Sequence, residues 1–179
     1  AVGVAGVDGI KFKETVGDQV GRDLEEAKKL LAEGLEEEGL TLETFKPVMI
    51  CDDTDTAQKN CAYFQEQWKA NLGVNVQVTP MPFKSRLAAM SSHDFSVILA
   101  GWSPDYNDPN TYLEMFTTGN GNNHGEYSSA AYDKLIEDAA TETDTAVRAD
   151  LLKQAELQLL EDMPIGPLYY EVREYITSS

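Results

Sequence analysis

Strand-like and helix-like patterns alternate over the first hundred residues, and this alternation is the feature that most limits the fold. Residues 48–51 form a short apolar run and residues 95–100 a mostly apolar one, while Val74, Val76 and Val78 alternate with polar residues. Helical periodicity fills the segments between them. Because parallel strands need long, right-handed crossover connections, this order predicts an α/β fold with a mainly parallel or mixed sheet flanked by helices.

Capping and breaking residues set the expected ends of these elements. Asp23, followed three residues later by Glu26, predicts the start of a helix that ends at Gly39. Pro80 predicts the end of the strand that begins at Val74, and Pro82 the start of the next helix. The remaining expected elements are a helix capped within residues 52–55 and ending at Gly73, a short helix from Asp108 and Pro109, helices over 130–141 and 144–161, and a last strand over 165–172.

The length of 179 residues fits one domain of ordinary size. Residues 1–20 contain several glycines and no sustained period, so we expect a loop or a poorly ordered segment there. Residues 21–179 are then predicted to form a single α/β lobe. The chain starts at Ala1 without a methionine and stops at Ser179, and we expect both ends to be cuts in a longer protein.

The charge balance limits the partners. The chain has 31 acidic and 14 basic residues, for a formal net charge of −17. This charge repels nucleic acid and anionic lipid, so we exclude nucleic acid as a partner. No stretch approaches the roughly 18 apolar residues of a membrane span, and no basic and apolar leader opens the chain. Any export signal or lipid anchor is therefore expected in a segment outside this chain.

Cysteine and histidine are too few to suggest a metal or catalytic cluster. Cys51 and Cys61 lack the spacing of a zinc site, and two cysteines do not make a disulfide scaffold. Cys61 lies on an apolar helical stripe, which favours a buried, unpaired thiol, with a bridge to Cys51 left as the alternative. His93 and His124 are far apart in the sequence, and we interpret His124 as a loop residue.

The strongest local signal is the run Gly-Trp-Ser-Pro-Asp-Tyr-Asn-Asp-Pro at residues 101–109. It follows the predicted strand 95–100, and ligands of open α/β sheets bind beyond the carboxyl ends of strands. Its aromatic and acidic residues suit a ligand with a cationic group. The alternative is structural, with Asp108 capping a helix and Trp102 packing into the core. Asp105 has no capping role at its spacing.

Several motifs, in order and spacing, resemble the oligopeptide- and dipeptide-binding proteins of extracellular solute-binding protein family 5. The resemblance covers nearly all of residues 20–176. The motifs that carry it are Ala-Lys-Lys-Leu-Leu-Ala-Glu at 27–33, Trp-Lys-Ala-Asn-Leu-Gly-Val at 68–74, the run at 101–109, Asn-Asn-His-Gly-Glu-Tyr-Ser at 122–128, Tyr-Asp-Lys-Leu-Ile at 132–136, and Pro164-Ile165 before Tyr169-Tyr170.

This resemblance implies a periplasmic-binding-protein-like lobe, the C-terminal one of a two-lobed protein that encloses its ligand between the lobes. In peptide-binding relatives the Asp that matches Asp105 receives the ligand's α-ammonium group, and the aromatic residue that matches Trp102 lines the same pocket. The resulting candidate ligand-binding residues are Asp105, Trp102, Ser103, Tyr106, Asn122 and Asn123. Turn chemistry explains Asn122 and Asn123 equally well. No catalytic residue, metal or cofactor is expected.

One residue departs from the pattern of some peptide-binding relatives. They carry an arginine three residues before the Trp, where it engages the peptide's carboxylate, and this chain has Leu99. Because this arginine is replaced by Leu99, the sequence makes no prediction about the length of the ligand. The departure also admits family members that bind other solutes, such as nickel chelates, haem, sugars or opines.

The expected function is that of a monomeric, extracellular or periplasmic binding component of an ABC importer, attached to the cell surface through a segment outside this chain. Its expected partners are a peptide or similar small solute and a membrane permease. We expect no enzymatic activity. The alternatives are capture of a non-peptide solute, a hydrolase that uses two carboxylates such as Asp105 and Asp108, and a sensory or adhesion role.

Overall fold

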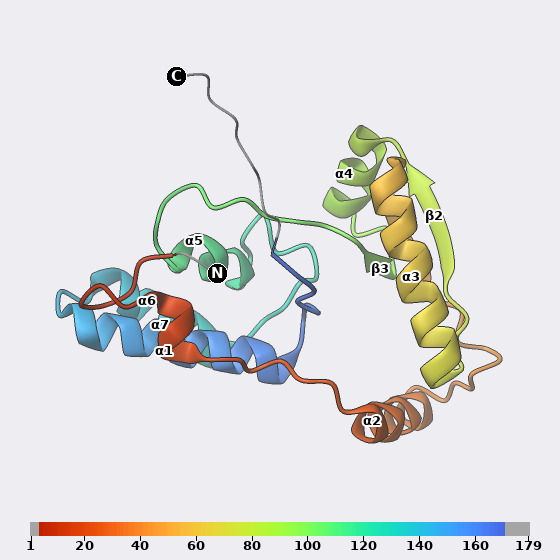
Figure 1. Ribbon diagram of the computed structural model, residues 1–179, viewed down its shortest axis with the longest axis horizontal. Coiled ribbons are helices and arrows are strands. Elements are labelled where there is room, and N and C mark those ends of the chain that lie inside the picture. The colour runs from red at the N-terminus through yellow and green to blue at the C-terminus, as the bar shows by residue number, and fades with distance from the viewer. Residues whose placement is uncertain (1–3, 171–179) are drawn as a thin grey trace, which may run out of the picture. The chain divides into compact units, whose positions relative to one another are not determined.

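The computed structural model describes residues 4–170, and these residues divide into two compact units (Figure 1). We call residues 22–102 the sheet unit. Residues 4–21 together with 103–170 form the helical unit. The prediction of one lobe over residues 21–179 differs from this division, since the first 21 residues group with the C-terminal half. Whether the two units make one lobe stays a prediction.

The sheet unit contains a three-stranded parallel sheet in the order β2-β1-β3, which confirms the predicted α/β class. Helix α3 follows β1 and helix α4 follows β2, as the crossover pattern requires, and α3 packs on the sheet (Figure 1). Helix α2 precedes β1 and contacts α3. The bounds are α2 Leu24–Glu37, β1 Val48–Asp52, α3 Asp55–Leu72, β2 Gln77–Met81, α4 Phe83–Ser91 and β3 Val97–Ile98.

The predicted helix boundaries of this unit are confirmed by their caps. The Asp23 carboxylate accepts a hydrogen bond from the Glu26 amide at 3.0 Å and begins α2. Within residues 52–55 it is Thr54 that caps α3, through the Ala57 amide. Helix α3 ends at Gly73, whose φ of 74° is left-handed and costs glycine no steric strain.

The strands differ from prediction in their bounds. Strand β2 begins at Gln77 rather than Val74 and includes Pro80, which the sequence predicts as the strand's end. Within the described residues β2 has a neighbour, β1, on one side only, so the missing Pro80 amide hydrogen can face away from the ladder. Val74 and Val76 are buried ahead of the strand. Strand β3 covers only Val97–Ile98 of the predicted 95–100.

Both cysteines lie in the core of the sheet unit. Cys51 and Cys61 are fully buried and free, which confirms the interpretation of Cys61 as an unpaired buried thiol. Burial, together with the neighbouring Cys51 thiol, raises the pKa of Cys61 to about 12. The thiol is therefore protonated at neutral pH and acts as a small apolar side chain. The two cysteines belong to one buried cluster with Met49, Val74 and Val76.

The helical unit is built on two long antiparallel helices. Helices α6 and α7 pack together, and α1 and α5 pack on α7. Ser129 caps α6 and Asp144 caps α7, which confirms the helices predicted at 130–141 and 144–161 to within a residue at each end. The bounds are α1 Phe12–Val16, α5 Asn110–Leu113, a 3₁₀ turn at Glu114–Phe116, α6 Ala130–Thr141 and α7 Thr145–Asp162.

The ends of the described chain differ most from prediction. The loop expected over residues 1–20 contains helix α1, and its Phe12 side chain is only 1% exposed in the core of the helical unit. A poorly ordered segment therefore does not describe residues 4–17. Residues 165–170 of the predicted last strand form no strand, since they share no backbone ladder with the described strands β1, β2 and β3. The predicted residues 171 and 172 lie outside the described part.

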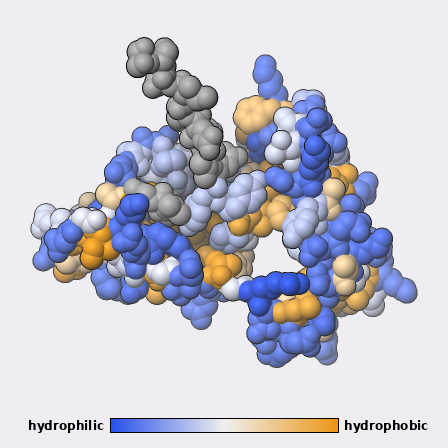
Figure 2. All heavy atoms as spheres, viewed as in Figure 1, coloured by the Kyte–Doolittle hydropathy of each residue, from blue (hydrophilic) through white to orange (hydrophobic). Residues whose placement is uncertain are grey.

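The outer surface is strongly hydrophilic, as the charge balance requires, and Figure 2 shows hydrophilic residues over most of the visible face. Helix α2 contributes no buried residue, and its glutamates are solvated. Within residues 4–170, no helix has the combined length and apolar character that crossing a membrane requires.

Replacing Gly6 with alanine is expected to destabilise the helical unit. A methyl group at this position would collide with the Ile10 carbonyl oxygen and the Phe12 amide nitrogen, both backbone atoms of the turn that leads into α1. We expect Gly6→Ala to lower the free energy of unfolding by about 1–3 kcal/mol in chemical denaturation. Gly21→Ala, with no atom near the added methyl, should change it by less than about 0.5 kcal/mol. Equal stability of the two variants would contradict this placement of the N-terminal segment.

Candidate functional site

The loop over residues 101–109 leads from strand β3 to helix α5, and its candidate ligand-binding residues are exposed. Trp102 is 40% exposed, so the alternative in which it packs into the core does not hold. Ser103 and Asp105 are exposed as well. Within the described residues the Asp105 carboxylate has no hydrogen-bond or ion-pair partner. Its charge is therefore available to a ligand.

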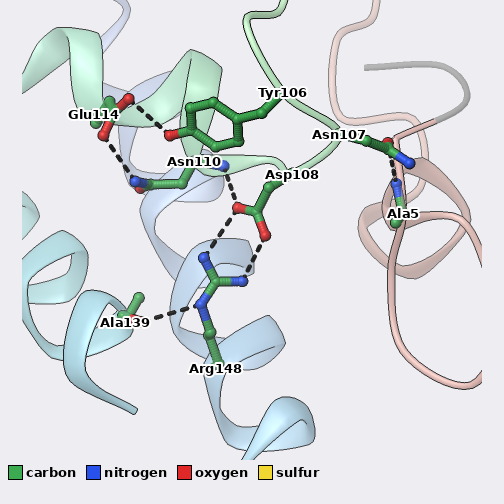
Figure 3. A network of polar contacts seen from close by, with 8 residues as sticks. All are labelled: Ala5, Tyr106, Asn107, Asp108, Asn110, Glu114, Ala139 and Arg148. Carbon is green, nitrogen blue, oxygen red and sulfur yellow. Dashed lines mark hydrogen bonds and ion pairs between the residues drawn. The ribbon is translucent and has the colours of Figure 1, made fainter. Parts of the chain in front are cut away.

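Asp108 has a structural role close to the predicted one. Its carboxylate accepts a hydrogen bond from the Asn110 amide at 2.9 Å, at the start of α5. It also forms a two-pronged ion pair with the Arg148 guanidinium on α7, at 2.7 and 3.0 Å (Figure 3). Arg148 is held in turn by the Ala139 carbonyl at 3.1 Å. The pair fixes the loop to the two long helices of the helical unit.

The ion pair changes the acidity of Asp108. Burial alone would raise its pKa, but the hydrogen bonds from Arg148 and Asn110 and the charge of Arg148 outweigh burial and hold the pKa below its ordinary value. Since the folded pKa is lowered, this carboxylate stabilises the fold above its unfolded pKa of about 3.9. The contribution is lost as the pH falls through the lower folded pKa.

We expect Asp108→Asn to destabilise the protein by about 2 kcal/mol at neutral pH, because the half-buried Arg148 loses its charged acceptor. The difference from wild type should shrink below pH 4, as Asp108 itself becomes protonated. Urea unfolding across this pH range measures both effects. Asp138→Asn is the control, because it breaks an exposed pair with Lys134 and should cost less than about 0.5 kcal/mol. A loss that does not depend on pH would contradict the assigned role.

Two further contacts fix the loop between Asp105 and α5. The Tyr106 hydroxyl donates to a Glu114 carboxylate oxygen at 2.7 Å, and the Asn107 side-chain oxygen accepts the Ala5 amide hydrogen at 3.0 Å (Figure 3). Burial and the hydrogen bond to Glu114 raise the pKa of Tyr106, so its hydroxyl stays protonated. The ring is 45% exposed, which leaves its face and not its hydroxyl for a ligand.

The two candidate asparagines have different surroundings. Asn123 is only 6% exposed, and its side chain donates to the carbonyls of Phe116, Thr117 and Tyr127 and accepts from the Tyr127 amide. Its hydrogen-bonding groups are used within the turn, so it is no longer a candidate for ligand contact. Asn122 is exposed, and its backbone amide donates to the Asn120 side chain. The turn chemistry weighed for both residues accounts for Asn123.

Two neighbouring features do not extend the site. Leu99, at the position of the arginine of some relatives, packs against the core of the sheet unit. A pocket of about 210 Å³ lies in the helical unit beside Arg148, and Asp105 does not line it. Arg148 holds the loop through Asp108, and the sequence analysis does not identify this residue. The available signal was a basic residue in the first turns of a helix, where the dipole disfavours it without an acidic partner.

Comparison with known proteins gives a family. Residues 4–124 match the model of the bacterial extracellular solute-binding proteins, family 5 Middle. The oligopeptide-binding protein OppA of Bacillus subtilis is 36% identical over 151 residues, which are 83% of this chain and 28% of that protein. The periplasmic oligopeptide-binding protein OppA of Salmonella typhimurium is 38% identical over 151 residues, 83% of this chain and 27% of that protein. The chain thus spans little more than a quarter of these relatives.

Solved structures agree. An oligopeptide ABC transporter substrate-binding domain from Bacillus anthracis has a TM-score of 0.84 at 36% identity, covering 89% of this chain and 31% of that one. OppA of Listeria monocytogenes bound to peptide has a TM-score of 0.78 at 32% identity, covering 88% and 30%. Sequence and structure therefore agree that this chain belongs to the bacterial extracellular solute-binding proteins of family 5.

Proposed function

We propose that this chain is the C-terminal lobe of a binding protein that captures peptides between two lobes for an ABC importer. The observation that carries the proposal is the Asp105 carboxylate, which is exposed and without a partner in the described residues while the side chains of the next three residues are hydrogen-bonded. A fixed loop that leaves one carboxylate free suits the capture of a cation.

The relatives favour a peptide over the other solutes of the family. The proteins from Bacillus subtilis and Salmonella typhimurium are named as oligopeptide-binding, and the Listeria protein was solved with peptide bound. Family likeness also matches Asp105 with the residue that receives the peptide's α-ammonium group. A nickel chelate, haem or sugar offers no ammonium for this carboxylate.

The physics of an enclosed ion pair supports selection for a free amino terminus. When a second lobe excludes water, the attraction between a carboxylate and an ammonium grows because the local dielectric falls. Each charge is then costly to bury without the other. A solute with a blocked amino terminus would leave Asp105 unpaired in the closed cleft. Strand-like hydrogen bonds to the peptide backbone would make recognition tolerant of side chains.

The hydrolase alternative requires a second catalytic carboxylate, and Asp108 is not suited to that role. A glycosidase pair needs one carboxyl group with a raised pKa to donate a proton. Asp108 is instead engaged by Arg148, and its pKa is lowered. We therefore propose binding without catalysis. The remaining parts of the proposal are a monomer, an extracellular or periplasmic location with surface attachment through another segment, and a permease as the partner of the full-length protein.

The test uses the full-length protein, purified from its own cells and analysed by native mass spectrometry for co-purified ligand. We expect peptides with free amino termini at one per protein. Titration calorimetry with a library of short peptides should then give stoichiometric binding, and incubation should leave the peptides uncleaved. Recovery of only a metal chelate, haem or sugar, with no heat from any peptide, would overturn the peptide assignment. Turnover of the peptides would instead favour an enzyme.

A further inference from the structure

A buried threonine holds the backbone of the residue that carries the free charge. Thr111 lies in α5 and is only 1% exposed. Its side-chain oxygen accepts a hydrogen bond from the Asp105 amide at 3.1 Å. Its own amide donates to the Asp108 carbonyl at 3.3 Å. A single buried residue of α5 therefore binds the loop at both Asp105 and Asp108.

Thr111 differs from the other anchors of the loop in the residue that it reaches. The Ala5 amide holds Asn107, and Arg148 holds Asp108, so these contacts fix the loop two and three residues beyond Asp105. The hydroxyl of Thr111 acts on Asp105 itself. Because a β-branched side chain has few χ1 rotamers and Thr111 is buried, its hydroxyl has little freedom to turn away from the Asp105 amide. The Asp105 backbone is thereby held while its carboxylate stays free.

A fixed Asp105 backbone matters because the Asp105 carboxylate must meet the ligand's ammonium group at one position. Affinity rises when a binding group is held in its bound conformation before the ligand arrives, since less conformational freedom is lost on binding. An exposed Asp105 without the contact from Thr111 would move with the loop. The Asp105 amide would also lose its protein acceptor.

We infer that Thr111 is a positioning residue for amino-terminal specificity, acting through its hydrogen bond to the Asp105 amide. The inference rests on the proposed function, because it assigns Thr111 to the same ammonium contact. Thr111 does not touch the ligand. Its substitution should therefore change the preference for a free amino terminus and not the affinity for the rest of the peptide.

The experiment measures two dissociation constants for each variant of the full-length protein by calorimetry. The probes are the library peptide that binds wild type best and an N-acetylated copy of it. Thr111→Val removes the acceptor and keeps the branched shape, and we expect the preference for the free peptide to fall by roughly three- to tenfold. Thr111→Ser keeps the hydroxyl and should restore it. Affinity for the acetylated copy should not change.

A merely structural role gives a different pattern. If Thr111→Val weakens both peptides equally, or if serine does not restore the preference, the inference is wrong. In an Asp105→Ala background, Thr111→Val should lower the preference no further, since the two residues act as one unit. If Thr111→Val fails to fold, Thr111→Ala gives the same readout. Slow hydrogen exchange of the Asp105 amide in wild type is the independent measurement, and fast exchange would overturn the contact.

Failure of the inference and failure of the proposed function are separable. In one outcome wild type prefers the free peptide, Asp105→Ala loses this preference and Thr111→Val keeps it. This outcome would overturn the inference about Thr111 and leave the proposed function standing. A wild type that binds no peptide would overturn both proposals.

Discussion

Asp105→Ala in the full-length protein is expected to weaken the binding of a peptide with a free amino terminus at least tenfold. Truncating one partner of an enclosed charge pair typically costs about 2–5 kcal/mol, which corresponds to roughly thirtyfold or more, and tenfold is the smallest effect consistent with the proposal. Most of this loss comes from leaving the peptide's ammonium buried without a counter-charge. Titration calorimetry of the two proteins with the same peptide measures the change.

Two controls separate this effect from a general loss of charge or fold. Glu137→Ala removes an exposed carboxylate from α6 in the same helical unit, and it should leave peptide affinity unchanged. An N-acetylated peptide should bind wild type weakly and should bind Asp105→Ala at least as tightly as wild type, since the substitution removes the carboxylate that this peptide leaves unpaired. If Asp105→Ala binds the free peptide as tightly as wild type does, Asp105 is not the ammonium partner.

Tyr132→Ala is expected to give the largest loss of stability in the helical unit. The Tyr132 side chain is fully buried, and its hydroxyl donates to the Leu113 carbonyl at 2.7 Å. Its ring packs edge-on against Tyr127 at 5.5 Å between centroids. Removal of a buried aromatic ring costs about 3–5 kcal/mol through lost burial and the cavity that remains. Thermal and urea unfolding should both show the loss.

Tyr132→Phe isolates the hydroxyl from the ring. It keeps the ring and leaves the Leu113 carbonyl without its donor, so the expected cost is about 1–3 kcal/mol. Tyr63→Ala removes the same kind of side chain from a position that is 61% exposed, and it should cost less than about 1 kcal/mol. Comparable losses for Tyr132→Ala and Tyr63→Ala would contradict the core described here.

The parts of the fold that depend on neighbouring residues could be predicted from the sequence. Asp23 and Gly73 mark helix ends because a capping side chain or a left-handed glycine acts within a few residues. The parallel sheet followed from the alternation of strand and helix patterns, since crossovers leave few topologies. The exposed position of Asp105 agrees with the absence of any capping role at its spacing.

The parts that depend on distant residues could not. Helix α1 has five residues, too few to show a period, and it is held by packing on α7. The ion pair of Asp108 and Arg148 joins residues 40 positions apart. The Asn123 side chain donates its hydrogen bonds to the carbonyls of Thr117 and Tyr127, on both sides of its turn. The residue type alone does not reveal these partners. Local patterns thus indicate which groups are polar, and tertiary contacts decide which remain free for a ligand.

The most direct test of the central claim is a crystal structure of the full-length protein with a peptide bound in its cleft. We expect the peptide's α-ammonium nitrogen to lie about 2.7–2.9 Å from an Asp105 carboxylate oxygen, the distance of a charge-assisted hydrogen bond. An ammonium group held by a different acid, with the Asp105 carboxylate facing solvent in the closed protein, would contradict the claim.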